Sequence, residues 1–319
     1  MGPRCPPWPC AFLGARIIDR LTVGMFDLKQ VQWRLHPPTT AGYCQTSQMK
    51  NLIATICLTI ALLLGSARVS WSQDYHKGYA AAQSGNFATA LREWAPLAKQ
   101  GNVNAQYNLG VMYENGQGVP KNYKTAVKWY RLAAEQGDAG AQFNLGNAYR
   151  HGLGVPQNDK TAVKWYRFPA EQGNAAVQYI LGQMYRQGRG VSQDYKIAVK
   201  WYKLAAEQGS AFAQYNLGMM YSKGRGVPQG YKTAVKWYRL AAEQGDADAQ
   251  GNLGVMYAFG TGVLKDYVYA HMWGNMAVSI GGKDKGKVRD FVAKQMTPPQ
   301  LKTAQDLAHK CVHTNYKGC

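Results

Sequence analysis

The sequence predicts an all-α fold, an α/α superhelical solenoid built from helix pairs. A unit of 36 residues recurs without a gap from Asn102 to Gly281, and each unit holds two runs of apolar residues at helical spacing. A glycine follows each run at the same position in every unit and is expected to end the helix. A fixed period of this size is typical of stacked repeats, in which each unit buries its apolar face only against its neighbours. Repeats 1 to 5 start at Asn102, Asp138, Asn174, Ser210 and Asp246.

Ahead of the repeats, the chain divides at Met49. Residues 1–48 are rich in Pro, Arg, Trp and Cys without a sustained period, whereas residues 49–72 have the layout of a signal peptide: a basic start, an apolar run and small residues. The apolar run is shorter than the roughly 20 residues of a membrane span. We expect cleavage near Gln73 and no transmembrane span after processing, with an uncleaved anchor as the alternative. Residues 1–48 are then an over-extended start or a disordered leader.

Residues 73–101 predict a helix pair of a different build. Tyr79, Ala82, Phe87 and Trp94 resemble a tetratricopeptide unit with a two-residue turn. Pro96 falls inside the second helix and should bend it. We expect this pair to cap the N-terminal end of the solenoid.

The first helix of each repeat begins after an N-cap residue and ends at a glycine. In repeat 1, Asn102 is the cap, Ala105, Leu109 and Met112 follow at helical spacing, and Gly116 is suited to the C′ position. A glycine also recurs inside these helices, where it costs about 1 kcal/mol relative to alanine. A neighbouring helix is therefore expected to pass too close for a side chain. These glycines are Gly110, Gly146, Gly182, Gly218 and Gly254.

The second helix of each repeat is two-faced. Ala126, Trp129, Tyr130 and Ala133 form one apolar stripe in repeat 1, and basic residues lie opposite. Pro169 replaces the stripe's last alanine in repeat 2, where a tolerated distortion near the helix end or a functional kink is expected. The basic positions, called the basic ladder below, are Lys124, Lys128, Arg131, Lys160, Lys164, Arg167, Lys196, Lys200, Lys203, Lys232, Lys236 and Arg239.

The repeated pattern A-x-x-x-L-G-x-x-Y-x-x-G-x-G-V, followed by A-x-x-W-Y-x-x-A-A-x-x-G, resembles the Sel-1-like repeat family, a relative of the tetratricopeptide repeats. The resemblance covers Asn102 to Gly281 in five copies. It implies a helical superhelix that binds other proteins, with the first helices lining a concave face. The spacing alone gives the solenoid and not the binding.

Variation on the repeated frame marks candidate partner-binding residues. The ends of the first helices differ between repeats while the frame is constant. We expect a protein partner there, with an acidic peptide segment as the first candidate because arginine suits bidentate recognition of carboxylates. Relaxed constraint on exposed residues is the alternative explanation. The candidates are Glu114, Arg150, His151, Arg186 and Lys223.

The C-terminal residues 282–319 predict two capping helices and a disulfide tail. One helix is expected over Lys283–Met296, and a capping box at Thr297 starts another that runs to about Val312. In an exported chain, Cys311 and Cys319 favour a disulfide. His309 and His313 have metal-ligand spacing, but Cys311 projects from another helical face, so no metal is expected.

The net charge of +19 leaves two interpretations of the basic ladder open. It is either a solvated outer face or a surface attracted to an anionic cell-envelope polymer. Nucleic acid is a disfavoured ligand, because aromatic residues do not interleave with the basic ladder. Export would also separate the protein from the nucleic acid of the cell.

No motif predicts catalysis or a cofactor. The sequence lacks G-x-S-x-G, H-E-x-x-H and a Walker loop. Some cysteine-rich members of the resembled family are linked to β-lactam binding or hydrolysis, but they carry a cysteine pair in each repeat, which this chain lacks. The sequence therefore predicts a secreted or periplasmic scaffold rather than a β-lactam or peptidoglycan hydrolase.

Overall fold

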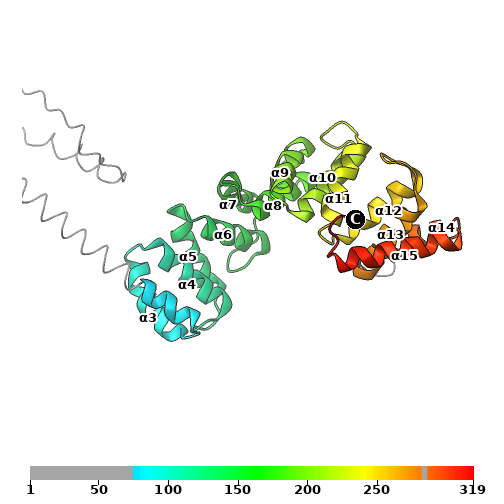
Figure 1. Cartoon of the computed structure of the whole chain (residues 1–319). Coiled ribbons are helices and arrows are strands. Elements are labelled where there is room, and N and C mark those ends of the chain that lie inside the picture. Colours follow the sequence, from blue (N-terminus) through cyan, green and yellow to red (C-terminus); the bar gives the residue numbers. More distant parts are fainter. Residues whose placement is uncertain (1–74, 282–285) are drawn as a thin grey trace, which may run out of the picture. The chain divides into compact units, whose positions relative to one another are not determined.

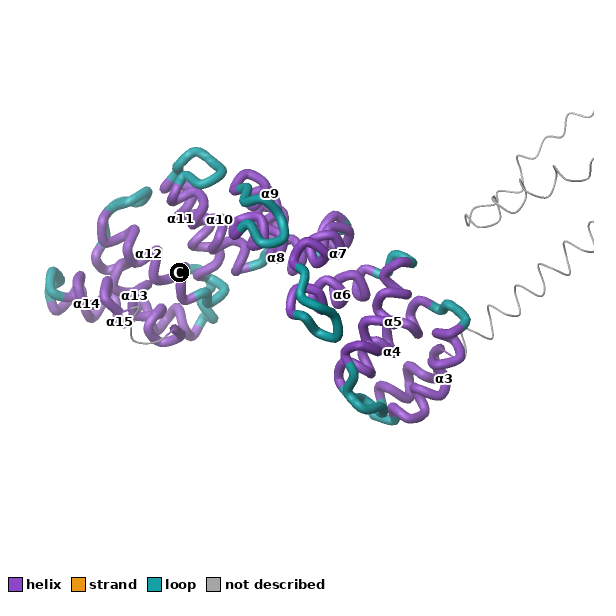
Figure 2. Tube along the Cα trace, turned by 180° about the vertical axis from the view of Figure 1, so that it is seen from behind, coloured by secondary structure: helices purple, strands orange, loops and turns teal. Residues whose placement is uncertain are grey.

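The computed structural model describes residues 75–281 and 286–319. The described residues form helices joined by short loops and contain no strand (Figure 2). The expectations for a leader over 1–48 and a signal peptide over 49–72 lie outside them. No helix in the described part is both long and apolar enough to cross a bilayer.

Consecutive helices pair in chain order, as the sequence predicts (Figure 1). Residues 75–83 are helical and precede α3. The following helices are α3 (Phe87–Lys99), α4 (Val103–Asn115), α5 (Tyr123–Glu135), α6 (Ala139–His151), α7 (Asp159–Glu171), α8 (Ala175–Gln187), α9 (Tyr195–Glu207), α10 (Ala211–Lys223), α11 (Tyr231–Ala242), α12 (Ala247–Phe259), α13 (Tyr267–Gly281), α14 (Lys287–Ala293) and α15 (Pro298–His313).

The helix ends follow from the repeated cap residues. In repeat 1, the Asn102 side chain accepts a hydrogen bond from the Ala105 N–H, and Gly116 ends α4 in the left-handed region at φ 75°. The second glycine of the turn has a separate reason. A Cβ at Gly190, where φ is 71°, would meet the backbone of Asp159 and Lys160, so this turn lies directly on the start of the preceding repeat's second helix.

In repeats 1 to 4, the glycine inside the first helix faces a tyrosine ring of its own repeat. A Cβ built at Gly182 would lie 2.6 Å from the Tyr202 ring, and Gly146 has the same relation to Tyr166. The expectation of a close neighbour is therefore confirmed, and the neighbour is a side chain rather than a backbone. Both tyrosines are fully buried, so this contact sets the distance between the two helices of a repeat.

Buried glutamines join successive repeats. The Gln142 Nε2 donates to the Ala134 carbonyl at 3.0 Å, linking α6 to the end of α5. A second bond joins the two helices within repeat 1, because the Gln136 Nε2 donates to the Gln106 Oε1 at 2.8 Å. The matching bond is missing in repeat 2, where the buried Gln142 Oε1 has no partner. Repeat 2 is also the one with Pro169, which is buried inside α7 without interrupting it.

Repeat 5 departs from the pattern and receives the C-terminal helices. Gly274 stands where the other repeats have the tyrosine, and a Cβ there would lie 3.0 Å from the Arg289 Cβ of α14. The described helix α14 is shorter than the expected Lys283–Met296. The capping box at the start of α15 is confirmed, because the Thr297 N–H donates to the Gln300 Oε1 at 2.9 Å.

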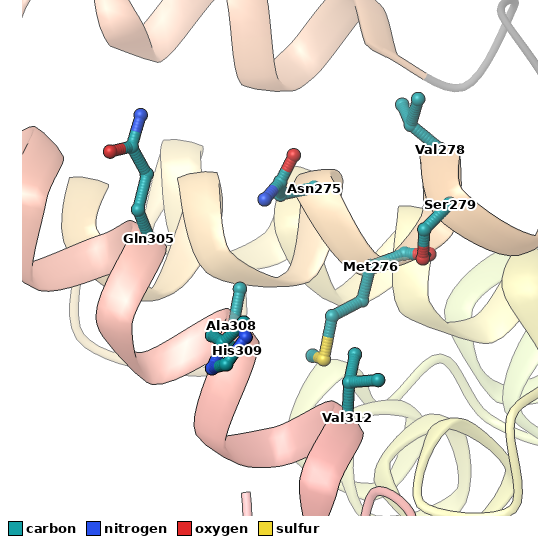
Figure 3. Close-up of a pocket in the computed structure, with 8 residues that line it drawn as sticks. All are labelled: Asn275, Met276, Val278, Ser279, Gln305, Ala308, His309 and Val312. Carbon is teal, nitrogen blue, oxygen red and sulfur yellow. The ribbon is translucent and has the colours of Figure 1, made fainter.

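Helix α15 covers the outer face of α13. Met272 and Met276 of α13 are buried in one cluster with Ala308 and Cys311 of α15. Figure 3 shows Met276 pointing toward Val312 of α15. The C-terminal helix therefore closes the apolar end of the array.

Cys319 lies beside Cys311, with Cα atoms 5.7 Å apart. A disulfide spans this separation, and the bond itself stays a prediction. His309 and His313 lie on the exposed side of α15 while Cys311 is buried, so the three do not converge. In the described part of the chain, no group of three or more His, Cys, Asp or Glu residues is arranged to hold a metal ion.

We predict that Gly182→Ala destabilises the fold although alanine is the better helix former. The added Cβ overlaps the buried Tyr202 ring, and such overpacking costs about 1–3 kcal/mol. Thermal unfolding followed by circular dichroism measures the change. Lys200→Ser, on the exposed face of α9, should stay within about 0.5 kcal/mol of the parent. A higher melting temperature for Gly182→Ala would contradict the close contact.

We predict that Cys311 and Cys319 resist thiol labelling in the exported protein until a reductant is added. Maleimide labelling followed by mass spectrometry measures the free thiols. Strong labelling of both cysteines without reductant would show that the tail is held by packing alone.

Candidate partner-binding surface

The sequence-predicted binding residues fall at two registers of the first helices. Glu114, Arg150 and Arg186 share one register and are half-buried. His151 and Lys223 lie at the next position along the helix and are exposed. The two groups therefore differ in what they contact, although the sequence placed them together.

The half-buried register contacts the buried tyrosine of its own repeat. The Tyr130 hydroxyl donates to the Glu114 carboxylate, and the Arg186 Nε donates to the Tyr202 hydroxyl at 3.2 Å. In repeat 2, a hydrogen bond and the charge of Arg150 oppose the rise in the pKa of Tyr166 that burial causes. A buried hydroxyl needs a hydrogen-bond partner, so this register serves the core as well as the surface.

Arg150 and Arg186 lack a carboxylate partner in the described part of the chain. The Arg150 Nε is buried without any hydrogen-bond acceptor. Burial raises the pKa of the Tyr179 phenol, and the guanidinium charges of Arg186 and Arg150 both oppose this rise. The two arginines thus lie around one tyrosine, where the charge of Asp246 opposes them. Two guanidinium groups against one carboxylate favour an anionic ligand.

An apolar pair lies in the same two repeats. At other junctions, an asparagine of a first helix bonds a tyrosine in the first helix of the preceding repeat. Burial raises the pKa values of Tyr107 and Tyr179, and side-chain hydrogen bonds from Asn144 and Asn216, respectively, oppose this rise. The repeat period alone does not reveal this series, because its two members lie in different repeats.

Between repeats 2 and 3 both partners of this series change, to Phe143 and Ile180, and both pack half-buried against the core. The replacement of the tyrosine hydroxyl and of the asparagine amide in the same pair is visible in the sequence and could have indicated this apolar site. Phe143, Arg150, Ile180 and Arg186 together are called the arginine surface below.

The repeats match a known family. The family model for the Sel1 repeat matches residues 103–138, 139–174, 175–210, 211–246 and 247–281. A comparison with curated proteins found no match.

Two solved structures are similar over most of the chain. One is c5321, a protective antigen of uropathogenic Escherichia coli strains with an SLR fold, at 34% identity and a TM-score of 0.67. That match covers 80% of this chain and 56% of the antigen, so this chain spans little more than half of its length. The other is a Sel1 repeat protein from Oxalobacter formigenes, at 34% identity and a TM-score of 0.65, covering 74% of this chain and 99% of that one.

We predict that the fold loses stability as the pH rises above about 10, the usual pKa of tyrosine. Burial raises the pKa of Tyr166 and of Tyr202 to about 12, so these phenols stay protonated in the folded chain while the unfolded chain ionises. The stabilisation is complete below pH 10 and is lost upward, at about 1.4 kcal/mol per pH unit for each tyrosine.

Denaturant unfolding between pH 9 and about 11.5 measures this slope. Tyr202→Phe should flatten it, and Tyr79→Phe at an exposed position should leave it unchanged. A stability independent of pH over this range would contradict the assignment.

Proposed function

This chain belongs to the Sel1-repeat family, and from that premise we propose that it is an exported adaptor that binds an acidic segment of a partner protein on its first helices. Sel1-repeat proteins are generally scaffolds for protein interactions, and the fold is typically non-catalytic. The segment lies in a groove along the first helices, on the concave side of the array. The observation that carries this proposal is the arginine surface.

The chemistry of the arginine surface fits an acidic segment with apolar residues. Arg150 and Arg186 provide two guanidinium groups without carboxylate partners, and guanidinium binds carboxylates bidentately. The bond of Arg186 to the buried Tyr202 limits its rotamers before a ligand arrives, which lowers the entropic cost of binding. Phe143 and Ile180 supply apolar contact in the same two repeats, and the exposed His151 and Lys223 extend the basic character.

Glu114 has a different place in the proposal. Its carboxylate accepts from Tyr130, so repeat 1 is negative where repeats 2 and 3 are positive. An acidic segment is therefore oriented away from Glu114, which contributes selectivity by repulsion rather than by contact.

Export is part of the proposal. The layout of residues 49–72 supports a signal peptide and a secreted or periplasmic location. The similar Escherichia coli protein is described as a protective antigen, which agrees with a place at or beyond the cell envelope. The adaptor function requires no cofactor and includes no catalytic step.

An affinity pull-down from a periplasmic extract, with the mature chain as bait, tests the adaptor function. A protein recovered in stoichiometric amount, whose binding one acidic peptide of that protein competes away, supports it. Turnover of a β-lactam by the purified chain would instead indicate an enzyme.

Binding to an anionic envelope polymer is the second candidate. The observation that favours it is that all positions of the basic ladder are exposed, with Lys203–Glu207 as the ion pair that involves a ladder residue in the described part. Retention on isolated cell wall that falls with increasing salt would support this candidate.

We predict that the double variant Arg150→Ala and Arg186→Ala weakens binding of the recovered partner by about 2–4 kcal/mol, because truncation leaves the partner's carboxylates unpaired. Titration calorimetry measures the loss. The matched variant Lys128→Ser, Lys164→Ser and Lys200→Ser should change the affinity little at moderate salt.

The opposite pattern would overturn the adaptor proposal. If the lysine variant abolishes binding and the arginine variant leaves it intact, the polymer candidate replaces it. Circular dichroism of both variants checks that the helices are retained, because Arg186 also bonds Tyr202.

A further inference from the structure

The second helices expose a large apolar residue beside the basic ladder. Leu132, Phe168, Leu204 and Leu240 share one register, directly after the last basic residue of each repeat, and are between 42 and 45% exposed. A face needed only for solubility has no use for an apolar residue at the same position in four repeats.

Repeat 5 shows what this face accommodates. Its residues at the registers of Lys236 and Leu240 are Met272 and Met276, and both are buried. The cover is α15, which presents Ala304, Ala308 and Cys311 on one side of the helix. The chain therefore already docks an amphipathic helix on the outer face of one second helix (Figures 1 and 3).

The same face of α11 contains an open groove. A cavity of about 480 Å³ lies along α11, bordered on one side by the turn at Gly262. Val235 and Leu240 give it an apolar floor, and basic side chains give it cationic walls. The Arg239 guanidinium donates to the Tyr257 hydroxyl at 2.5 Å, which holds one wall in place. The lining residues are Lys232, Val235, Lys236, Arg239, Leu240 and Gly262.

We propose that the α11 groove docks an amphipathic helix of a partner protein that carries acidic residues beside a stripe of small and apolar ones. Docking resembles that of α15 on α13, except that the Met272 register is a lysine in α11, so the incoming helix needs carboxylates there. A second copy of this chain does not fit, because its net charge is +19 and its own α15 exposes Lys302 and Lys310. The site is separate from the arginine surface and does not depend on it.

The probe is a peptide of residues 297–314 in which Lys302, His309, Lys310 and His313 are glutamate and Cys311 is alanine. It keeps the stripe of α15 and reverses the charge of its exposed side. Fluorescence anisotropy with the full mature chain should give saturable binding, and a scrambled peptide of equal composition should bind at least about tenfold more weakly. A benzophenone at the Leu307 position should crosslink to residues 232–240 and 260–262.

Matched substitutions test the groove. Leu240→Ser and Lys236→Ser should each weaken peptide binding by about fivefold or more. Leu264→Ser, at a leucine that is 90% exposed outside the groove, and Lys265→Ser should stay within about twofold. Arg150→Ala with Arg186→Ala should have no effect, which separates this proposal from the adaptor function.

Three results would overturn the proposal. Equal binding of the scrambled peptide would show that the face attracts acidic peptides only by non-specific charge. Crosslinks confined to the first helices would assign the peptide to the arginine surface. Co-sedimentation with phosphatidylglycerol vesicles that Leu240→Ser abolishes, without peptide binding, would make the face a membrane contact.

Discussion

The contact between a helical glycine and a tyrosine ring is the constraint on which each repeat depends. In repeats 1 to 4, the ring occupies the space that a Cβ on the first helix would fill, which brings the two helices together. The same ring carries a hydroxyl to the end of the first helix, where a buried polar atom requires a partner. Glu114 accepts from this hydroxyl in repeat 1, and Arg186 donates to it in repeat 3. In repeat 2, the Tyr166 hydroxyl donates to the Asn147 Oδ1 at 2.7 Å. Residues that vary between repeats are thus restricted to types that can satisfy a phenol.

Where the tyrosine is absent, the array ends. Gly274 in repeat 5 removes the ring, and α14 approaches in its place. At the matching position of the first helix, Ala258 is buried and needs no hydrogen bond. The loss of the ring, the loss of its partner and the arrival of the C-terminal helices therefore go together. They explain why α13 carries methionines where the other repeats carry a lysine and an exposed leucine or phenylalanine.

Much of the fold follows from the sequence because its signals are local and repeated. The caps at Asn102 and Thr297 and the 36-residue spacing needed no knowledge of distant contacts. The position of the candidate surface at the ends of the first helices was predictable, but the hydrogen bonds of its residues were not. That Arg186 bonds Tyr202 depends on the distance between two helices, which periodicity does not give. The pair Phe143 and Ile180 was visible as two departures 37 residues apart, but only the packing shows that both lie against the same buried cluster.

The missing glutamine bond of repeat 2 has a consequence for cooperativity. In a linear array, stability is a sum of units and of the junctions between neighbours, so local opening begins at the weakest unit or junction. The unpartnered Gln142 Oε1 shows that the bond between the two helices of repeat 2 is missing, and Pro169 lies in the same repeat. Gln250 Oε1 of repeat 5 also lacks a partner, but the C-terminal helices pack against that repeat. Repeat 2 is therefore expected to open first. The arginine surface spans repeats 2 and 3. A bound segment would therefore stabilise repeat 2 against local opening, and occupancy would slow amide hydrogen exchange in repeats 2 and 3.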